Sequence, residues 1–304
     1  MKASAALLRR AVFVAGPTSV GKSGIALRLA QKHGGEIVCA DAFQLYREFP
    51  VLSAQPSAAE KSAVPHHLFG VVSCADQMDA LRYAEMAHEV LSDIAARGKT
   101  PFVVGGSGLY SQALVAGLPV LPAIDPALRE RVRGMTLEEM TTELRELDPQ
   151  SLLAIDANNP RRVARRLELC LQTGRSASQV LGQLPAPPAG LRGVVLTRAR
   201  DDLHGRIAAA VRARLEGGAV EEVRSTRDTA GGTARQILGW REITAFLDGK
   251  LSADGCRERL VIATRQYAKR QLTWFRSKST FPEEDISEVT PDISDRIARR
   301  LGLS

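Results

Sequence analysis

The sequence predicts an α/β fold in which a parallel sheet carries a helical insertion. Short apolar, β-prone runs alternate with helical patterns up to residue 106, which is the rhythm of parallel βαβ units. A Pro-rich stretch interrupts this rhythm near residue 117, and the helical patterns that follow have no strands between them. A new β-prone run at 193–198 restores the first pattern, so the chain is expected to return to the sheet there.

The individual elements follow from apolar spacing and from breaker residues. Gly16 ends the first strand, and Gly34 with Gly35 closes the helix that follows it. The expected strands are 11–15, 36–41, 100–106 and 193–198, and the expected helices are 22–33, about 76–97, 127–147 and 160–173. Residues 202–278 are expected to be mostly helical, and the Pro-rich segments 117–126 and 183–193 are read as linkers. This predicts a core over 1–118, an insertion over 119–192, and a return to the core with basic C-terminal helices over 193–304.

Composition narrows the class of protein. The 304 residues include 41 Lys and Arg against 34 Asp and Glu, a net charge of +7, which weakly favours a polyanionic partner. The four cysteines are scattered without a CxxC pair, so they predict neither a zinc site nor a disulfide framework. Arg9 and Arg10 split the first apolar run, and no apolar run reaches the roughly 18 residues of a membrane span. A cytoplasmic, monomeric protein is expected.

A phosphate-binding loop follows the first expected strand. Residues Gly16, Pro17, Thr18, Ser19, Val20, Gly21, Lys22 and Ser23 match the pattern GxxxxGK[ST] between a strand and a helix. Its backbone N–H groups and the helix N-terminus attract phosphate oxygens, Lys22 neutralises a terminal phosphate, and the Ser23 hydroxyl can bind Mg²⁺. The fold is therefore expected to be a P-loop NTPase-like parallel sheet with a helical insertion, and the ligand a diphosphate or triphosphate.

Two further loops are expected at the same edge of the sheet. Asp41 ends the second expected strand, where its carboxylate can ligate Mg²⁺ through water or act as a general base. Gln44 follows it, and Ser107 follows the third strand in a Gly-rich loop that could hydrogen-bond a phosphate or a base. Turn-forming roles remain the alternative for both loops.

Basic residues gather in two later segments. Arg161, Arg162, Arg165 and Arg166 occupy less than two turns of the expected 160–173 helix, where phosphates of a nucleic acid would offset their repulsion. The segment 257–278 carries seven Lys or Arg and one Glu, with Leu260, Ile262, Ala263 and Ala268 expected to face partly inward. A solvated charged face is the alternative in each case.

The segments GPTSVGKS, DAFQLYR, VPHHL, VGGSGLY, NNPRRVARRLEL, LGWRE and TRQYAKRQLTWFR, in this order over residues 16–276, resemble those of the tRNA dimethylallyltransferase family. The resemblance implies transfer of a dimethylallyl group from dimethylallyl diphosphate to the exocyclic amine of the adenine 3′ to the anticodon. It also implies Mg²⁺, and an insertion that grips the tRNA anticodon stem-loop.

The resemblance also implies roles for individual residues. Asp41 would be the general base, assisted by Lys22 and Ser23 at the diphosphate. Contacts with tRNA would come from Asp41, Ala42, Phe43, Gln44, Ser107, Arg129, Arg161, Arg162, Val163, Ala164, Arg165, Gln236, Gly239 and Arg241.

The chain departs from the family pattern at three places. Ala42 replaces a serine, Gln55 stands in a segment that usually carries a lysine, and Ala210 replaces an arginine that reaches the diphosphate. Arg212 or Arg214 would be the nearest substitute for that arginine.

Three alternative functions remain open from the sequence. They are a transferase for free adenine nucleotides, a P-loop ATPase or kinase, and a tRNA-binding protein with weak or no catalysis.

Overall fold

The computed structural model describes residues 4–119, 121–182, 186–288 and 293–303. The chain forms two compact units, one of Met1–Val115 with Pro187–Ser304 and one of Ala116–Ala186. Residues 120 and 183–185 of the two expected Pro-rich linkers lie outside the described ranges.

Six parallel strands form one sheet in the larger unit, in the order β3-β2-β4-β1-β5-β6. The strands are β1 (Val12–Ala15), β2 (Gly35–Cys39), β3 (His66–His67), β4 (Thr100–Gly105), β5 (Arg192–Thr197) and β6 (Glu283–Asp285). The four expected strands are confirmed, although β2 ends at Cys39, so Asp41 lies in the loop after the strand. β3 and β6 were not predicted, because two histidines and three acidic residues give no apolar run.

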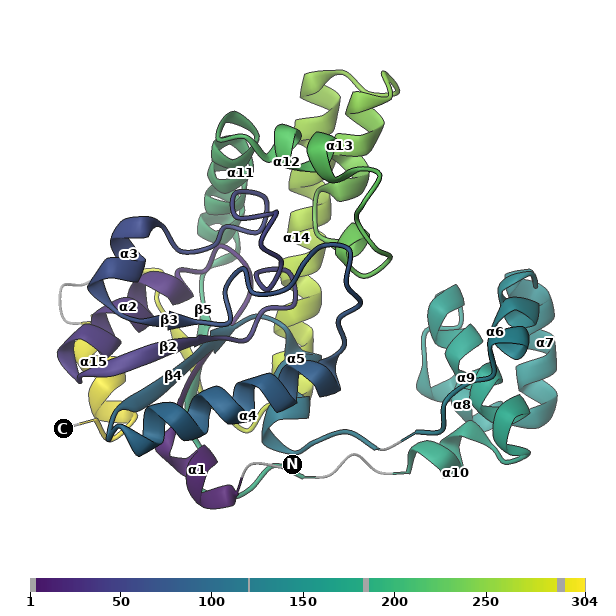
Figure 1. Cartoon of the computed structure of the whole chain (residues 1–304), viewed down its shortest axis with the longest axis horizontal. Helices are drawn as coiled ribbons and strands as arrows, with labels where there is room; N and C mark the ends of the chain where they lie inside the picture. Colours follow the sequence, from purple (N-terminus) through teal and green to yellow (C-terminus); the bar gives the residue numbers. More distant parts are fainter. Residues whose placement is uncertain (1–3, 120, 183–185, 289–292, 304) are drawn as a thin grey trace. The chain divides into compact units, whose positions relative to one another are not determined.

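Helices cover both faces of this sheet (Figure 1). Side chains alternate along β1, so Val12 and Val14 face a core shared with α2 (Lys22–Lys32), α11 (Arg200–Glu216) and α15 (Ile293–Arg300). On the other face, α4 (Ala80–Ala96) packs against β4, α5 (Gly108–Val115) and α1 (Ala5–Arg10). The α/β class is thereby confirmed, with helices on either side of a buried parallel sheet.

The C-terminal part of the larger unit is mostly helical, as expected. Its remaining elements are α12 (Ala219–Thr226), η1 (Ala234–Gln236), α13 (Trp240–Leu247) and the 26-residue α14 (Ala253–Lys278), while α3 (Ala58–Ala63) precedes β3. Leu260 and Ala268 of α14 are buried, but Ile262 is 53% exposed, so the expectation that Ile262 faces inward was wrong.

The smaller unit is entirely helical over its described residues. It contains α6 (Pro126–Arg133), α7 (Leu137–Leu147), α8 (Pro149–Ala154), α9 (Pro160–Thr173) and α10 (Ala177–Leu181). The single helix expected over 127–147 is two helices, because α6 ends at Arg133 with Gly134 as its C-cap and a capping box at Thr136 starts α7. Asn159 caps α9 and Pro160 occupies its first turn, so the helix begins where the expected 160–173 helix begins. Leu144, Val163 and Leu167 form the centre of a separate core.

Candidate active site

The phosphate-binding loop has the backbone that its sequence requires. Gly16, Ser19 and Gly21 have φ values of 142°, 63° and 110°. A Cβ at Gly16 would lie 2.5 Å from the carbonyl oxygen of Leu196 on β5, so only glycine fits there. The loop leads directly into α2, whose first residue is Lys22. Backbone N–H groups therefore converge at a helix N-terminus, which is the arrangement that binds phosphate.

Lys22 is held over this loop. Its Nζ donates a hydrogen bond of 2.8 Å to the carbonyl oxygen of Pro17. Burial lowers the pKa of Lys22 to about 8, while the carboxylate of Asp41 opposes the shift and the charge of Arg214 adds to it. An arriving phosphate would favour the protonated amine.

Other elements hold the loop from outside. Arg198, directly after β5, donates to the carbonyl oxygen of Val20 at 2.7 Å, and Arg206 of α11 donates to that of Ser19 at 3.0 Å. The amide N–H of Thr18 donates to Oε1 of Gln271 on α14 at 2.8 Å.

Asp41 lies in a short structured loop beyond β2. Its Oδ1 accepts the N–H of Phe43 at 3.0 Å, and the N–H of Ala42 donates to Oγ of Ser107 at 2.9 Å. Gln44 donates from Nε2 to the carbonyl oxygens of Ser53 and Ala54 at 3.1 and 2.7 Å. The loops after β2 and β4 are thus tied together beside the carboxylate.

One cleft of the larger unit brings the phosphate loop and Asp41 together. Lys22, Ser23, Asp41 and Gln44 line it, and so do Arg206, Ala210 and Arg214 of α11. The carboxyl ends of β1, β2 and β4 lead into this cleft, as expected for an open α/β sheet.

Arg214 lies in this cleft, one helical turn after Ala210. Its Nε is buried and has no hydrogen-bond partner among the described residues, and burial lowers its pKa against the opposing effect of Asp41. Arg212 is exposed and lines a different hollow with Glu216 and Phe246. Of the two substitutes that the sequence suggested for Ala210, the structure places Arg214 at the cleft.

A second cleft is lined by the residues that come next in the loops after β2 and β4, namely Ala42 after Asp41 and Gly106 after Gly105. Its lining includes Ala42, Phe43, Ser107, Gln236, Tyr267, Arg270, Gln271 and Trp274. The rings of Phe43 and Tyr267 are 6.0 Å apart, and the guanidinium of Arg270 lies 5.8 Å from the centre of the Tyr267 ring. The sequence predicted a basic helix here and favoured a core role for Tyr267 and Trp274, while Arg270 and Gln271 were not singled out. The spacing of these four residues, which places them along one side of a helix, was the available signal.

The remaining residues of the larger unit to which the resemblance assigns tRNA contacts differ in their surroundings. Gly239 is buried, starts α13 with φ of 103°, and a Cβ there would lie 2.9 Å from Cδ1 of Leu52. Its conformation and packing explain the glycine. Arg241 is exposed, as is Gln236, which lines the second cleft.

The arginines that the resemblance assigns to tRNA in the smaller unit differ in exposure and in ion pairing. Arg161 and Arg162 are exposed at the start of α9. Nη1 of Arg165 lies 3.5 Å from Oε2 of Glu168, and Nε of Arg129 lies 3.9 Å from Oε1 of the same carboxylate. Val163 is fully buried in the core of this unit, so the expected contact of its side chain with tRNA is not possible. Ala164 is partly buried.

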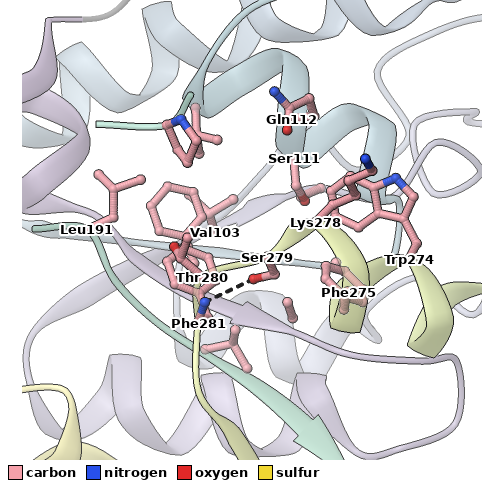
Figure 2. A pocket seen from close by; sticks show the side chains of 17 residues that line it. Val103, Ser111, Gln112, Leu191, Trp274, Phe275, Lys278, Ser279, Thr280 and Phe281 are labelled. Atoms are coloured by element: carbon pink, nitrogen blue, oxygen red, sulfur yellow. Dashed lines mark hydrogen bonds between the residues drawn. The ribbon is translucent and has the colours of Figure 1, made fainter. Parts of the chain in front are cut away.

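A mostly apolar cavity lies beside β1 and β4 (Figure 2). Phe13, Val103, Trp274 and Phe281 contribute to its wall, and Lys278 is the one charged residue in its described lining. It therefore gathers no set of groups for phosphate chemistry.

Three further features concern the described residues as a whole. Within the described ranges there is no group of three or more His, Cys, Asp or Glu side chains that could hold a metal ion, and no helix is long and apolar enough to cross a membrane. The four cysteines are free and buried.

Comparisons with known proteins match nearly the whole chain. Residues 44–278 match the IPP transferase family and residues 9–67 the isopentenyl transferase family. The tRNA dimethylallyltransferase of Anaeromyxobacter dehalogenans is 40% identical over 96% of this chain and 99% of its own, and that of Akkermansia muciniphila is 38% identical with the same coverage.

Solved structures agree. The tRNA isopentenylpyrophosphate transferase of Bacillus halodurans superposes with a TM-score of 0.70 at 31% identity, over 96% of both chains. A eukaryotic dimethylallyltransferase acting on tRNA gives a TM-score of 0.78 at 26% identity, over 95% of this chain and 77% of the other. The matched motifs, the clefts that they form and these relatives show that the chain belongs to the IPP transferase family.

Proposed function

We propose that the protein is a tRNA dimethylallyltransferase, which transfers the dimethylallyl group of dimethylallyl diphosphate to the exocyclic amine of the adenine 3′ to the anticodon. The observation that carries this proposal is that consecutive residues line two clefts: Asp41 and Gly105 line the one with the phosphate loop, and Ala42 and Gly106 line the one with aromatic and polar side chains. One cleft suits a diphosphate, and the other suits a base.

The first cleft provides charge for the leaving group. The loop amides, Lys22 and Arg214 surround the position of a diphosphate, and their positive charge stabilises the oxygen that is released when the allylic C–O bond breaks. Arg214 takes the place of the arginine that this chain lacks at position 210.

The second cleft receives the adenine. Ala42, Phe43 and Ser107 line this cleft and Gln44 lines the first one, and from there they would contact the base. Asp41 accepts one proton from the amine as the new C–N bond forms. An anticodon loop is unpaired, so its adenine leaves the stack at low cost.

Mg²⁺ fits the oxygen donors of the first cleft. Ser23 and Asp41 both line it, the latter suited to binding through water, and such sparse oxygen ligation leaves positions for waters and phosphate oxygens. When bound, Mg²⁺ supplies further positive charge to the diphosphate. The residues would hold it without a dedicated carboxylate cage.

The tRNA would be held by contacts outside the clefts as well. Exposed Arg161 and Arg162, with Arg165 and Arg129 beside them in the smaller unit, suit the phosphates of an anticodon stem-loop. Gln236 and Arg241 add exposed polar groups on the larger unit. We propose that one protomer in the cytoplasm carries the complete site.

A parallel assay tests this function. The protein is incubated with radiolabelled dimethylallyl diphosphate and Mg²⁺, with unmodified tRNA in one tube and AMP in the other. Label in tRNA is the expected result. Label only in AMP would identify a nucleotide prenyltransferase, and binding of tRNA without label in either acceptor would identify a protein that binds without catalysing.

A further inference from the structure

Gln271 joins the two loops on which the reacting groups would be held. Its side-chain Oε1 accepts the N–H of Thr18 in the phosphate loop at 2.8 Å, and its Nε2 donates to the carbonyl oxygen of Gly106 after β4 at 2.9 Å. The residue is 5% exposed. Both polar ends of one buried amide are therefore used, each by a different strand–helix connection.

The surroundings leave this amide little freedom. A Cβ at Gly106 would lie 2.2 Å from Nε2 of Gln271, so the two loops close tightly on the side chain. Tyr267, one helical turn earlier on α14, lines the second cleft together with Ser107 and Gln271. The amide of Gln271 projects from the 26-residue helix α14.

A continuous series of contacts runs from the phosphate loop to the carboxylate. Thr18 is bonded to Gln271, Gln271 to Gly106, and the next residue, Ser107, accepts the N–H of Ala42 beside Asp41. Moving the amide of Gln271 would change the spacing between the diphosphate and the base.

We propose that Gln271 is a positioning residue, whose bridging amide fixes the distance between the phosphate loop and the loop that holds the acceptor base. The inference rests on the proposed function, because it assigns the two loops to the two substrates. Group transfer needs the amine nitrogen, the allylic carbon and the leaving diphosphate oxygen in line. An error of about 1 Å in this alignment can reduce the rate about 100-fold.

The variant Gln271→Met tests this role. Methionine keeps the length of the side chain and the helical propensity but removes both hydrogen bonds. We expect kcat for transfer to tRNA to fall roughly 10- to 100-fold, while KM for dimethylallyl diphosphate and Kd for tRNA change less than about threefold.

Thr264→Val is the matched control on the same helix. Thr264 is 1% exposed, and its Oγ1 donates to the carbonyl oxygen of Leu260 at 2.6 Å, so the change removes a buried hydrogen bond that has no link to the clefts. Both variants are expected to lower Tm, but only Gln271→Met is expected to lower kcat. Equal kcat in the two variants would overturn the positioning role.

A second variant perturbs the same contact from its other side. Gly106→Ala places a methyl group against Nε2 of Gln271, so it should also lower kcat more than KM. It replaces Gln271→Met if that variant does not fold, and an unchanged kcat would likewise overturn the inference. Failure of the proposed function itself is distinguishable, because the wild-type protein would then transfer no label to tRNA in the same assay.

Discussion

Removing Arg214 should weaken diphosphate binding while leaving the fold in place. In Arg214→Met the cleft loses a guanidinium whose buried Nε has no hydrogen-bond partner within the described part of the chain. Methionine keeps most of the apolar stem that packs in helix α11.

The magnitude follows from the type of contact. One hydrogen bond to a charged group contributes about 1.5–3 kcal/mol. Each 1.4 kcal/mol is about a factor of ten in an equilibrium constant, so Kd for dimethylallyl diphosphate should rise roughly 10- to 100-fold. The pKa of Lys22 should rise at the same time, because the charge of Arg214 helps to lower it.

Calorimetric titration of the tRNA-free protein with dimethylallyl diphosphate and Mg²⁺ measures this affinity. Arg212→Met is the control, since it removes the same charge two residues earlier on α11, from an exposed side chain outside the cleft. Adding Ala210→Arg to the Arg214→Met variant should restore much of the lost affinity, because both positions line the cleft. Equal affinities of Arg214→Met and the wild type would refute the reasoning.

Three other predictions concern separate parts of the molecule. Because burial lowers the pKa of Lys22 to about 8, kcat/KM for dimethylallyl diphosphate should fall above about pH 8 as the amine loses its charge, and a flat profile to pH 10 would contradict this. The double variant Arg161→Gln/Arg165→Gln should raise Kd for tRNA and reduce the slope of log Kd against log salt by about two, whereas an unchanged slope would exclude these phosphate contacts. Glu36 is buried on β2. Burial raises the pKa of its carboxyl group, but hydrogen bonds from Arg97 and His67 have the larger combined effect and lower this pKa. Glu36→Gln should therefore lower Tm at neutral pH. That difference should vanish as the pH falls through the lowered pKa, because the stabilising carboxylate is then protonated in the wild type too, and a difference that persists in acid would contradict the assignment.

Local signals made the phosphate loop and the first strands predictable. The glycines at 16 and 21, the following lysine and the preceding apolar run all act within a few residues, and the structure forms β1 and α2 within one residue of the predicted bounds. Asn159 and Pro160 predicted the start of α9 for the same reason.

Contacts between distant segments were not predictable. The two partners of Gln271 lie 253 and 165 residues away in the chain, so no spacing rule could identify its bridge. Val163 was predicted to contact tRNA because it lies within a motif, but its side chain is buried in the core of the smaller unit. Membership of a motif therefore did not predict which side of the helix the residue occupies. Arg214 was one of two open substitutes for Ala210, and only the packing of α11 against the cleft separated them.

The most direct test of the account compares the wild type with Asp41→Asn in a single turnover. Asparagine keeps the Oδ1 that accepts the N–H of Phe43 but cannot take a proton from the amine. With labelled dimethylallyl diphosphate, Mg²⁺ and unmodified tRNA, the wild type should label one adenosine next to the anticodon. The variant should bind tRNA within about threefold of the wild type and transfer at least roughly 100-fold more slowly. Transfer by Asp41→Asn at the wild-type rate, or label on any group other than that adenosine in the wild type, would contradict the account.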